Sequence, residues 1–350
     1  LFSDWVYRAL IFLVVSCPCA IAISVPLGYF SGIGKASKEG ILVKGSDYLE
    51  LLSSVNKIVF DKTGTITTGI SNDYKLEILD DKYNEKDIIN YYVKGEALSN
   101  HPLAKSVLNV FNKKVSTKDV LNYKETAGKG ISYEIDGKKI KIGSSSFVNA
   151  SDKDSYIYLK IDGKVAAKLK LIDDIKKDSI SAILELKKQN IKTFMFTGDK
   201  KKSAEAVAKK TGVDEVFYEM LPDDKYKKLD KIIKENDKKT AFVGDGINDA
   251  PSLALSDVGI SMGMRGSASA IEASDVVIMN DSLSKIPEAI KISKFTKKII
   301  KQNLIFAIGI KVLVLVLSAI GVANMWQAVF ADTGVTLLTI LNTTRILRKK

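Results

Sequence analysis

The sequence predicts an α/β fold built on a parallel sheet, with an inserted α+β domain and three transmembrane helices. Three short apolar runs, each followed by polar residues and a glycine, predict strands of that sheet. Alternating apolar and polar residues in a lysine-rich middle region predict the inserted domain. Long apolar stretches near both ends of the chain predict the transmembrane helices.

The apolar residues concentrate in three stretches, although the chain as a whole has an ordinary composition. Of its 350 residues, 46% are hydrophobic and 27% are charged. Residues 5–27, 304–323 and 325–341 are almost unbroken apolar runs, each able to cross ~30 Å of hydrocarbon as a helix. The alternatives are buried core helices, or a signal peptide for the first run, which lacks a basic start and a cleavage site. We therefore expect three membrane spans.

The charge pattern indicates how these spans are oriented. The net charge of +12 comes from 53 basic and 41 acidic residues, without the aromatic-interleaved basic stripe of a nucleic-acid binder. Basic residues cluster beside one end of each span, and the loop at 321–324 carries no charge, so the middle of the chain is expected in the cytoplasm, beside the plasma membrane. The residues that set this orientation are Lys35, Lys38, Lys44, Lys297, Lys298, Lys301, Arg345, Arg348, Lys349 and Lys350.

Between the spans, the sequence predicts secondary structure in a definite order. Residues 35–52 are expected to form a helical connector that Gly40 interrupts, and a buried strand follows at 58–60. Hairpins are expected to turn at Asp136–Gly137 and Asp162–Gly163. Beyond residue 171, amphipathic helices alternate with strands, and we expect the helices at 179–189, 203–210 and 225–234 and the strands from 193, 240, 257 and 275.

Acidic and hydroxyl side chains stand where three of these strands end. They are Asp61, Thr197, Asp245 and Asp249. Open parallel sheets bind ligands at the carboxyl ends of their strands, so we expect the four side chains to converge there. A helix cap is a sufficient explanation for one acid, but not for three matching strand ends. Clustered carboxylates with glycine turns suit magnesium and a phosphoryl group.

Cys17 and Cys19 are the only cysteines, and Pro18 stands between them inside the first apolar stretch. A disulfide across one residue would be badly strained, so we expect the cysteines to act as metal ligands. Pro18 removes a backbone donor and predicts a break in the helix, which a membrane tolerates where it lines a site. Thiolates suit zinc, cadmium, lead or copper(I).

Two charged residues, Lys311 and Asp332, stand inside the other two apolar stretches. Each charge costs at least ~2.5 kcal/mol on membrane insertion, so a functional role is expected, the alternative being a pair that reaches opposite interfaces. Two thiolates and Asp332 carry three negative charges, which a divalent metal and Lys311 would neutralise together, whereas monovalent copper would not need the carboxylate. We expect Lys311 to pair with Asp332 in the metal-free state and to help expel the metal.

Three motifs give the chain a family resemblance. They read DKTGT at 61–65, TGD at 197–199 and GDGINDAP at 244–251. Together they resemble the phosphorylation domain of the P-type ATPases, a branch of the haloacid-dehalogenase-like (Rossmann-like) fold. The Cys-Pro-Cys motif narrows the resemblance to the heavy-metal-transporting branch, and Lys311 with Asp332 narrows it to the zinc-, cadmium- and lead-exporting subgroup.

The resemblance implies a division of the chain into a discontinuous phosphorylation domain, an inserted domain and membrane helices. We expect a transmembrane helix with Cys-Pro-Cys at 1–32, the phosphorylation domain at 33–69 and 169–292, a nucleotide-binding domain at 70–168, and two transmembrane helices at 293–350. Family members carry further helices and an actuator domain before this point. We therefore expect a carboxyl-terminal portion that binds nucleotide but does not complete the reaction cycle.

By the same resemblance, Asp61 is the nucleophile that ATP phosphorylates, and it shares Mg²⁺ with Asp245 and the carbonyl group of Thr63. Lys225 supplies a fixed cation, and Thr197 donates a hydrogen bond to the transferred oxygens. The other motif residues complete the site, with Asp249 also beside Mg²⁺; they are Lys62, Gly198, Asp199, Asn248 and Asp249.

The nucleotide site is also implied by resemblance. Glu96 and His101 resemble an ATP-binding signature in which His101 packs near the adenine and Glu96 accepts a hydrogen bond from it. Gly128 and Gly130 resemble paired glycines that let the backbone approach the nucleotide, although such a pair alone is more often a β-turn. Asp173 resembles the hinge between the two cytosolic domains, with a solvated turn as the plain alternative.

The sequence therefore predicts ATP-driven export of Zn²⁺, Cd²⁺ or Pb²⁺ through an aspartyl phosphate on Asp61, with ATP and Mg²⁺ as cofactors. A copper(I) pump is the first alternative, which Lys311 and Asp332 disfavour. A soluble haloacid-dehalogenase-like phosphatase is disfavoured by the inserted domain, and a non-catalytic metal-binding membrane protein by the intact motifs. The expected partners are the bilayer, the metal ion and the amino-terminal part of the same polypeptide, and no nucleic acid.

Overall fold

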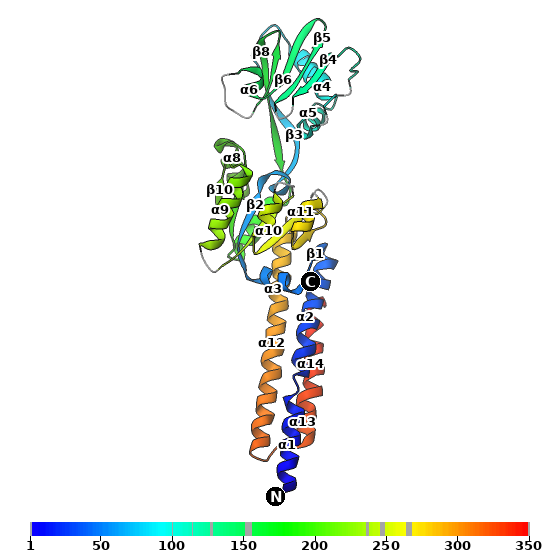
Figure 1. Cartoon of the computed structure of the whole chain (residues 1–350), viewed down its shortest axis with the longest axis vertical. Coiled ribbons are helices and arrows are strands. Elements are labelled where there is room, and N and C mark those ends of the chain that lie inside the picture. Colours follow the sequence, from blue (N-terminus) through cyan, green and yellow to red (C-terminus); the bar gives the residue numbers. More distant parts are fainter. Residues whose placement is uncertain are drawn as a thin grey trace. The chain divides into compact units, whose positions relative to one another are not determined.

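The structure is a computed structural model, and it describes residues 2–99, 101–113, 115–126, 129–150, 156–235, 238–245, 249–263 and 268–348. Figure 1 shows the course of the chain. The chain divides into two compact units. One comprises residues 1–60, 180–194 and 222–350, and the other comprises residues 61–179 and 195–221.

A seven-stranded sheet in the order β1-β13-β12-β11-β2-β9-β10 carries the polar strand ends. β11 runs parallel to both β2 and β12, and Phe60 of β2 lies opposite Val243 of β11. β1 closes one edge of the sheet, antiparallel to β13. The strands are β1 (Ile41–Val43), β2 (Val55–Asp61), β9 (Lys192–Phe196), β10 (Glu215–Phe217), β11 (Lys239–Gly244), β12 (Val258–Met262) and β13 (Val276–Ile278).

The central strands form where the apolar runs are continuous. Residues 58–60 of β2 and 241–243 of β11 are fully buried, as expected for parallel strands covered on both faces. The five predicted strands of this sheet are confirmed. The prediction of a helical connector over 35–52 was wrong in its middle, because Gly40 adopts φ 75° and the chain then forms β1 before the next helix.

The three predicted amphipathic helices of this α/β region are confirmed, and two shorter helices accompany them. The longer ones are α7 (Ser179–Lys188), α8 (Lys201–Thr211) and α9 (Pro222–Lys234), and the shorter ones are α10 (Ala250–Leu255) and α11 (Ala268–Ala273). α3 (Ser46–Ser54) leads directly into β2.

A second sheet, of six antiparallel strands in the order β3-β8-β7-β6-β5-β4, is formed by the inserted sequence. Its first and last strands in the chain, β3 and β8, pair from Thr67 opposite Ile175 to Ile78 opposite Ala167. The predicted hairpin turns are confirmed, because both residues of each turn have positive φ. The elements are β3 (Thr67–Ile78), β4 (Leu121–Thr126), β5 (Gly130–Ile135), β6 (Lys138–Gly143), β7 (Ile157–Ile161), β8 (Lys164–Ile175), α4 (Glu85–Glu96), α5 (Pro102–Phe111) and α6 (Ser145–Val148).

The apolar stretches form a separate set of long helices. Among the described residues, the segments 2–38 and 285–319 are long and apolar enough to cross a membrane. The predicted break at Pro18 is present between α1 (Phe2–Ser16) and α2 (Cys19–Lys38). The third predicted span is helical, but a π-helical turn divides it into α13 (Met325–Val329), η3 (Phe330–Gly334) and α14 (Val335–Thr343). α12 (Lys285–Ala319) is the longest helix described, and α15 (Arg345–Arg348) follows α14.

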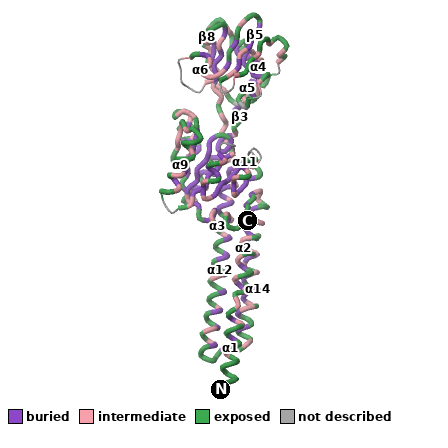
Figure 2. Tube along the Cα trace, in the orientation of Figure 1, coloured by how far each residue is buried: buried purple, intermediate pink, exposed green. Residues whose placement is uncertain are grey.

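These helices pack on one another through small side chains and leave large apolar ones exposed. Ala20, Ala307 and Val335 form one buried cluster between α2, α12 and α14. Figure 2 shows exposed positions along the length of the helices, and on α12 they include large apolar side chains such as Ile305 and Val316. Soluble surfaces rarely expose apolar side chains along a whole helix, whereas lipid-facing surfaces do.

Candidate functional site

Three carboxylates lie together at the sheet edge where β2 and β11 end. Asp61 is the last residue of β2, and Asp245 directly follows β11. One oxygen from each of these residues and one from Asp249 lie within 4.8 Å of one another. Carboxylate oxygens are the ligands that Mg²⁺ prefers, so this set fits the ion. The structure thus brings together three of the four residues predicted to hold Mg²⁺.

The turn after β2 fixes the direction of the Asp61 side chain. Gly64 has φ 74°, a conformation that favours glycine, and it lets the chain reverse immediately after the strand. The backbone N–H of Thr63 then donates to Asp61 Oδ2 over 3.1 Å. The Thr67 hydroxyl closes the turn by donating to the carbonyl of Lys62 over 3.1 Å.

Lys62 links the first motif to the second motif and to Asp173, the predicted hinge residue. Its ammonium group lies 2.7 Å from Asp199 Oδ2 and 3.2 Å from Asp173 Oδ2. Burial alone would lower the pKa of Lys62, but the two carboxylates outweigh it and raise that pKa, so the side chain stays charged. Ser71 also donates to Asp173 over 3.0 Å, a contact that no sequence motif indicated.

Asp249 is held beside a lysine from a neighbouring helix. The ammonium group of Lys225, near the start of α9, lies 3.5 Å from Asp249 Oδ1, and both side chains are largely buried. Gly244 makes room for this carboxylate, because a Cβ atom there would lie 2.8 Å from that of Asp249. Thr197 follows β9 and is buried. Asn248 lies outside the described residues.

The predicted nucleotide residues lie around the end of α4 and the start of α5. Glu96, the last residue of α4, is buried, and burial followed by the nearby charge of Glu125 raises its pKa to about 7. Ser99 connects this region by donating to Glu125 over 3.0 Å and accepting from the backbone N–H of His101 over 3.1 Å. His101 caps α5, and its exposed ring accepts from the N–H of Leu103 over 3.2 Å.

Of the two glycines predicted for the nucleotide site, Gly130 lies where β5 begins. Gly130 has φ 149°, and a Cβ atom there would lie 2.7 Å from the Cα atom of Gly143. The close approach of β5 to β6 therefore already requires glycine at this position. Gly128 lies outside the described residues.

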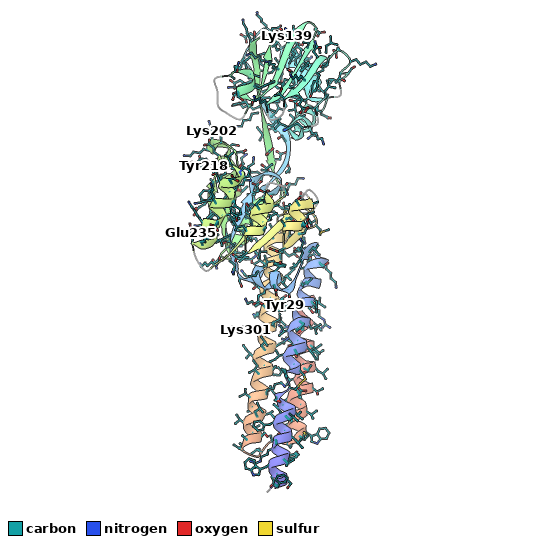
Figure 3. All side chains as sticks on the ribbon, viewed as in Figure 1. Tyr29, Lys139, Lys202, Tyr218, Glu235 and Lys301 are labelled. Atoms are coloured by element: carbon teal, nitrogen blue, oxygen red, sulfur yellow. A yellow bond between two sulfur atoms is a disulfide. The ribbon has the colours of Figure 1, made fainter. Side chains whose placement is uncertain are left out.

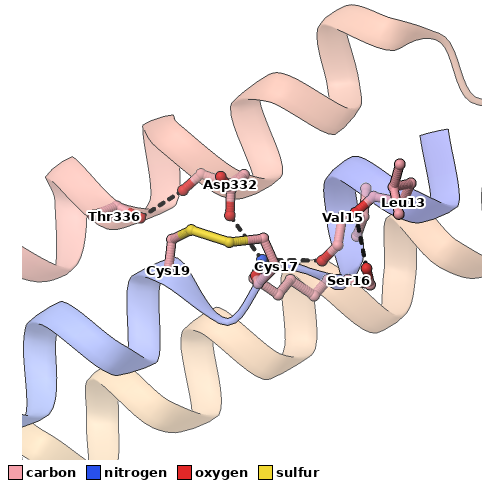
Figure 4. Close-up of a disulfide and its surroundings, with 8 residues drawn as sticks. Leu13, Val15, Ser16, Cys17, Cys19, Asp332 and Thr336 are labelled. Atoms are coloured by element: carbon pink, nitrogen blue, oxygen red, sulfur yellow. Dashed lines mark hydrogen bonds and ion pairs between the residues drawn. A yellow bond between two sulfur atoms is a disulfide. The ribbon is translucent and has the colours of Figure 1, made fainter. Parts of the chain in front are cut away.

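The cysteines lie at the break between α1 and α2, and the structure joins them by a disulfide (Figure 4). The prediction that they would not pair was wrong. The break at Pro18 sets their Cα atoms 5.5 Å apart, a separation that a disulfide spans. One carboxylate oxygen of Asp332 and the two sulfur atoms lie within 4.8 Å of one another, so the predicted ligands are together.

Lys311 reaches the same point from α12, and the predicted pair with Asp332 is confirmed. Its ammonium group lies 3.0 Å from Asp332 Oδ1. It also donates to the carbonyl of Val15 over 3.1 Å and to the carbonyl of Cys17. These carbonyls stand where α1 ends, and Pro18 has no N–H group to offer, so Lys311 supplies donors that the broken helix lacks.

A π-helical turn places Asp332 on this inner face. Asp332 lies within η3, where the extra residue of the turn changes the direction in which the helix presents its side chains. Gly334 permits the turn, because a Cβ atom there would lie 2.6 Å from the ring of Phe330. Thr336 then donates to the carbonyl of Asp332 over 2.6 Å, as Figure 4 shows.

Comparison with known proteins shows which family the chain belongs to. The model of the haloacid dehalogenase-like hydrolases matches residues 56–257. The chain is 43% identical to a cadmium, zinc and cobalt-transporting ATPase of Bacillus subtilis (strain 168), over 99% of this chain and 51% of that protein. It is 42% identical to a zinc-transporting ATPase of Synechocystis sp., over 98% of this chain and 49% of that protein. The chain thus spans about half the length of the curated relatives that it matches.

A solved structure agrees with these relatives. The crystal structure of a zinc-transporting PIB-type ATPase in its E2.Pi state superposes with a TM-score of 0.82 and 30% sequence identity, covering 99% of this chain and 59% of that one. The match includes the apolar helices as well as the two sheets, since almost the whole chain is covered. The chain therefore belongs to the haloacid dehalogenase-like hydrolases.

Proposed function

We propose that this chain carries the phosphorylation site and the metal site of an ATP-driven exporter of divalent soft metal ions. The observation that carries the proposal is that one chain holds both a carboxylate cluster around Asp61 and a set of two cysteines and Asp332 inside apolar helices. The relatives, which are named for zinc, cadmium and cobalt transport, support the choice of substrate class.

Phosphorylation would begin with attack of a carboxylate oxygen of Asp61 on the γ-phosphorus of ATP. The bond to the bridging oxygen breaks, ADP leaves, and an aspartyl phosphate remains. Mg²⁺, when bound by Asp61, Asp245, Asp249 and the carbonyl of Thr63, neutralises the phosphate charge that otherwise repels the carboxylate. Lys225 adds a fixed positive charge, and Thr197 donates to the transferred oxygens.

Nucleotide binding would fall to the second sheet and its helices. In this proposal His101 stacks near the adenine, Glu96 accepts a hydrogen bond from it, and Gly128 with Gly130 let the backbone approach. Asp173, held by Lys62, is the hinge residue through which the nucleotide and the phosphorylation motif are positioned together.

Metal binding requires the reduced form of the two cysteines, because a thiolate rather than a disulfide sulfur is the ligand. Cys17, Cys19 and Asp332 would then bind Zn²⁺, Cd²⁺ or Pb²⁺, with Lys311 as the counter-ion that balances the remaining charge. The apolar exterior of the helices and the lysines at their ends support a plasma-membrane location with cytoplasmic catalytic domains.

The direct test is transfer of phosphate from γ-labelled ATP to the reduced chain in detergent with Mg²⁺. We expect acid-stable, hydroxylamine-sensitive label on the wild-type chain and on an Asp80→Asn control, and none on Asp61→Asn. Zn²⁺ and Cd²⁺ should raise the label and Cys17→Ser should abolish that response, whereas a response to copper(I) alone would favour the copper alternative. Label retained on Asp61→Asn would overturn the assignment of the nucleophile.

A further inference from the structure

Polar side chains form a second group inside the apolar helices, on the cytoplasmic side of the cysteines. Asn303 of α12 donates to the carbonyl of Thr339 over 3.1 Å and to the Thr343 hydroxyl over 3.0 Å. It also accepts from the side-chain amide of Asn342 over 2.8 Å. Asn303, Thr339 and Thr343 are buried between helices whose outer surfaces are apolar. Buried polar groups at this depth are expensive, which makes a functional role the default expectation.

The packing of α2 places Ser24 at the same level as Asn303 and Thr339. Ala20 contacts Ala307 and Val335 in one cluster, and Gly28 packs against Ile300. Because α12 runs antiparallel to α2 and α14 runs parallel to it (Figure 1), one turn beyond Ala20 brings Ser24 level with Asn303 and Thr339. Ser24 lies five residues beyond Cys19, so this level is ~7.5 Å from that of Cys19 along α2, at ~1.5 Å per residue.

Ser24 is buried at this level, but its hydroxyl group makes no hydrogen bond to the described residues. It is 1% exposed, and its Oγ atom has no hydrogen-bond partner among the described residues. Leaving such a group unpaired costs about 1–3 kcal/mol, so an unpaired buried hydroxyl calls for an explanation. The residues one turn before and after it on α2 are Ala20 and Gly28, which offer the hydroxyl no side-chain hydrogen-bonding group.

We propose that Ser24, Asn303 and Thr339 form an oxygen-lined transit site that an incoming divalent cation passes on its way to the cysteines. Neutral oxygen ligands replace part of a hydration shell but hold soft metals weakly, whereas thiolates hold them firmly. A cation would therefore lose water at this level and move on to Cys17, Cys19 and Asp332. The inference rests on the proposed function, in which those three residues bind the transported metal.

The test measures how fast Cd²⁺ binds to and leaves the reduced chain, followed by the ultraviolet absorption of the cadmium–thiolate bonds. If the hydroxyl stabilises the ion only while it moves to or from the cysteines, Ser24→Ala should slow Cd²⁺ binding and Cd²⁺ release by about tenfold each. The Kd for Cd²⁺ should then stay within about a factor of two of the wild-type value. Ser24→Thr, which keeps the hydroxyl, should restore both rates. Ser318→Ala is the matched control, because Ser318 is equally buried and unpaired in the described part of α12 but lies on the other side of Lys311.

Three results would overturn the transit site. Binding and release rates that are unchanged in Ser24→Ala would show that the ion does not use the hydroxyl. A Kd for Cd²⁺ that rises about tenfold would show that the hydroxyl has a structural role. Equal slowing by Ser318→Ala would show a general effect of removing buried hydroxyls. A wild-type chain that gives no cadmium–thiolate absorption after reduction would instead contradict the proposed function, so the two failures are distinguishable.

Discussion

Glu96 is a buried acid whose protonation state depends on folding. Burial, with a smaller contribution from Glu125, raises its pKa from 4.5 to about 7. Between these values the folded chain keeps a proton that the unfolded chain has lost, so the free energy of unfolding falls as the pH rises. The full loss above the folded pKa amounts to about 3 kcal/mol for a shift of this size.

Replacing Glu96 with Gln should therefore remove this decline with pH, because the side chain stays neutral in both states. Hydrogen exchange of the backbone amides in β5 and β6, followed between about pH 5 and 8, measures the stability of this sheet. Glu134→Gln is the control, since Glu134 is an acid of the same sheet that bonds at the surface to Asn122. A decline that persists in Glu96→Gln would place its origin elsewhere.

Lys311 has a second testable role, as the group that competes with the metal. It is bonded to Asp332 and to two backbone carbonyls. Lys311→Ala removes this competitor and leaves the negative site without a counter-ion, so Cd²⁺ release should slow by about tenfold, more than binding changes. Lys301→Ala, an exposed lysine of the same helix (Figure 3), should leave release unchanged. Release as fast as in the wild type would rule out the counter-ion role.

Among single residues, the sequence predicted the contacts that follow from the geometry of parallel sheets and from the free-energy cost of burying a charge. Asp61 and Asp245 were placed together because parallel strands end at one edge, and the Lys311–Asp332 pair because isolated charges are expensive in a membrane. The bonds from Lys311 to the carbonyls of Val15 and Cys17 could not be predicted, because they depend on the angle at which the chain leaves α1. The disulfide depended on the same local geometry.

Two glycines determine how closely α2 approaches α12. A Cβ atom at Gly28 would lie 2.6 Å from Ile300, and one at Gly32 would lie 2.6 Å from Thr296. Gly32→Val should thus separate the helices and lower the free energy of unfolding of the helical part by about 1–3 kcal/mol. Thermal unfolding in detergent, followed by tryptophan fluorescence, measures the change. Gly34→Val has the same helix propensity cost without a neighbour within 4 Å, so an equal loss there would refute the packing argument.

The elements that sequence patterns predicted best are the long ones. Each apolar stretch became helical, and the central strands were evident from continuous apolar runs. β1 and β10 have three residues each, too few for a periodic pattern, and β1 pairs with β13, which is distant in sequence. The π-helical turn around Asp332 was not predicted, because it arises where Gly334 and the ring of Phe330 pack together.

α12 connects the sheet to the proposed metal site as one uninterrupted helix. It begins seven residues after β13 and continues beyond Lys311, for 35 residues or ~52 Å. Replacing exposed Lys298 and Lys301 with Gly costs about 1 kcal/mol of helix propensity each and makes this connection more flexible. We expect Cd²⁺ affinity and nucleotide binding to persist, while the increase in phosphorylation that Cd²⁺ causes is lost.

The matched control for this prediction replaces the same two lysines with Ala, which removes the charges but keeps the helix stiff. Phosphorylation from labelled ATP with and without Cd²⁺ measures the coupling in both variants. If the glycine variant responds to Cd²⁺ as strongly as the alanine variant, the stiffness of α12 does not transmit the signal.

The strand pair β1–β13 attaches two of the helices that surround the proposed metal site to the same edge of the sheet. α2 ends three residues before β1, and α12 follows β13. A tilt of this edge would displace both helices in the same direction, whereas α14 has no strand attached to it in the described part of the chain. In the proposed function, such a tilt would move Cys19 and Lys311 relative to Asp332, which lies in η3 directly before α14. If Cys17, Cys19 and Asp332 bind the ion as proposed, this displacement would remove the carboxylate from the ion and leave the two sulfur ligands.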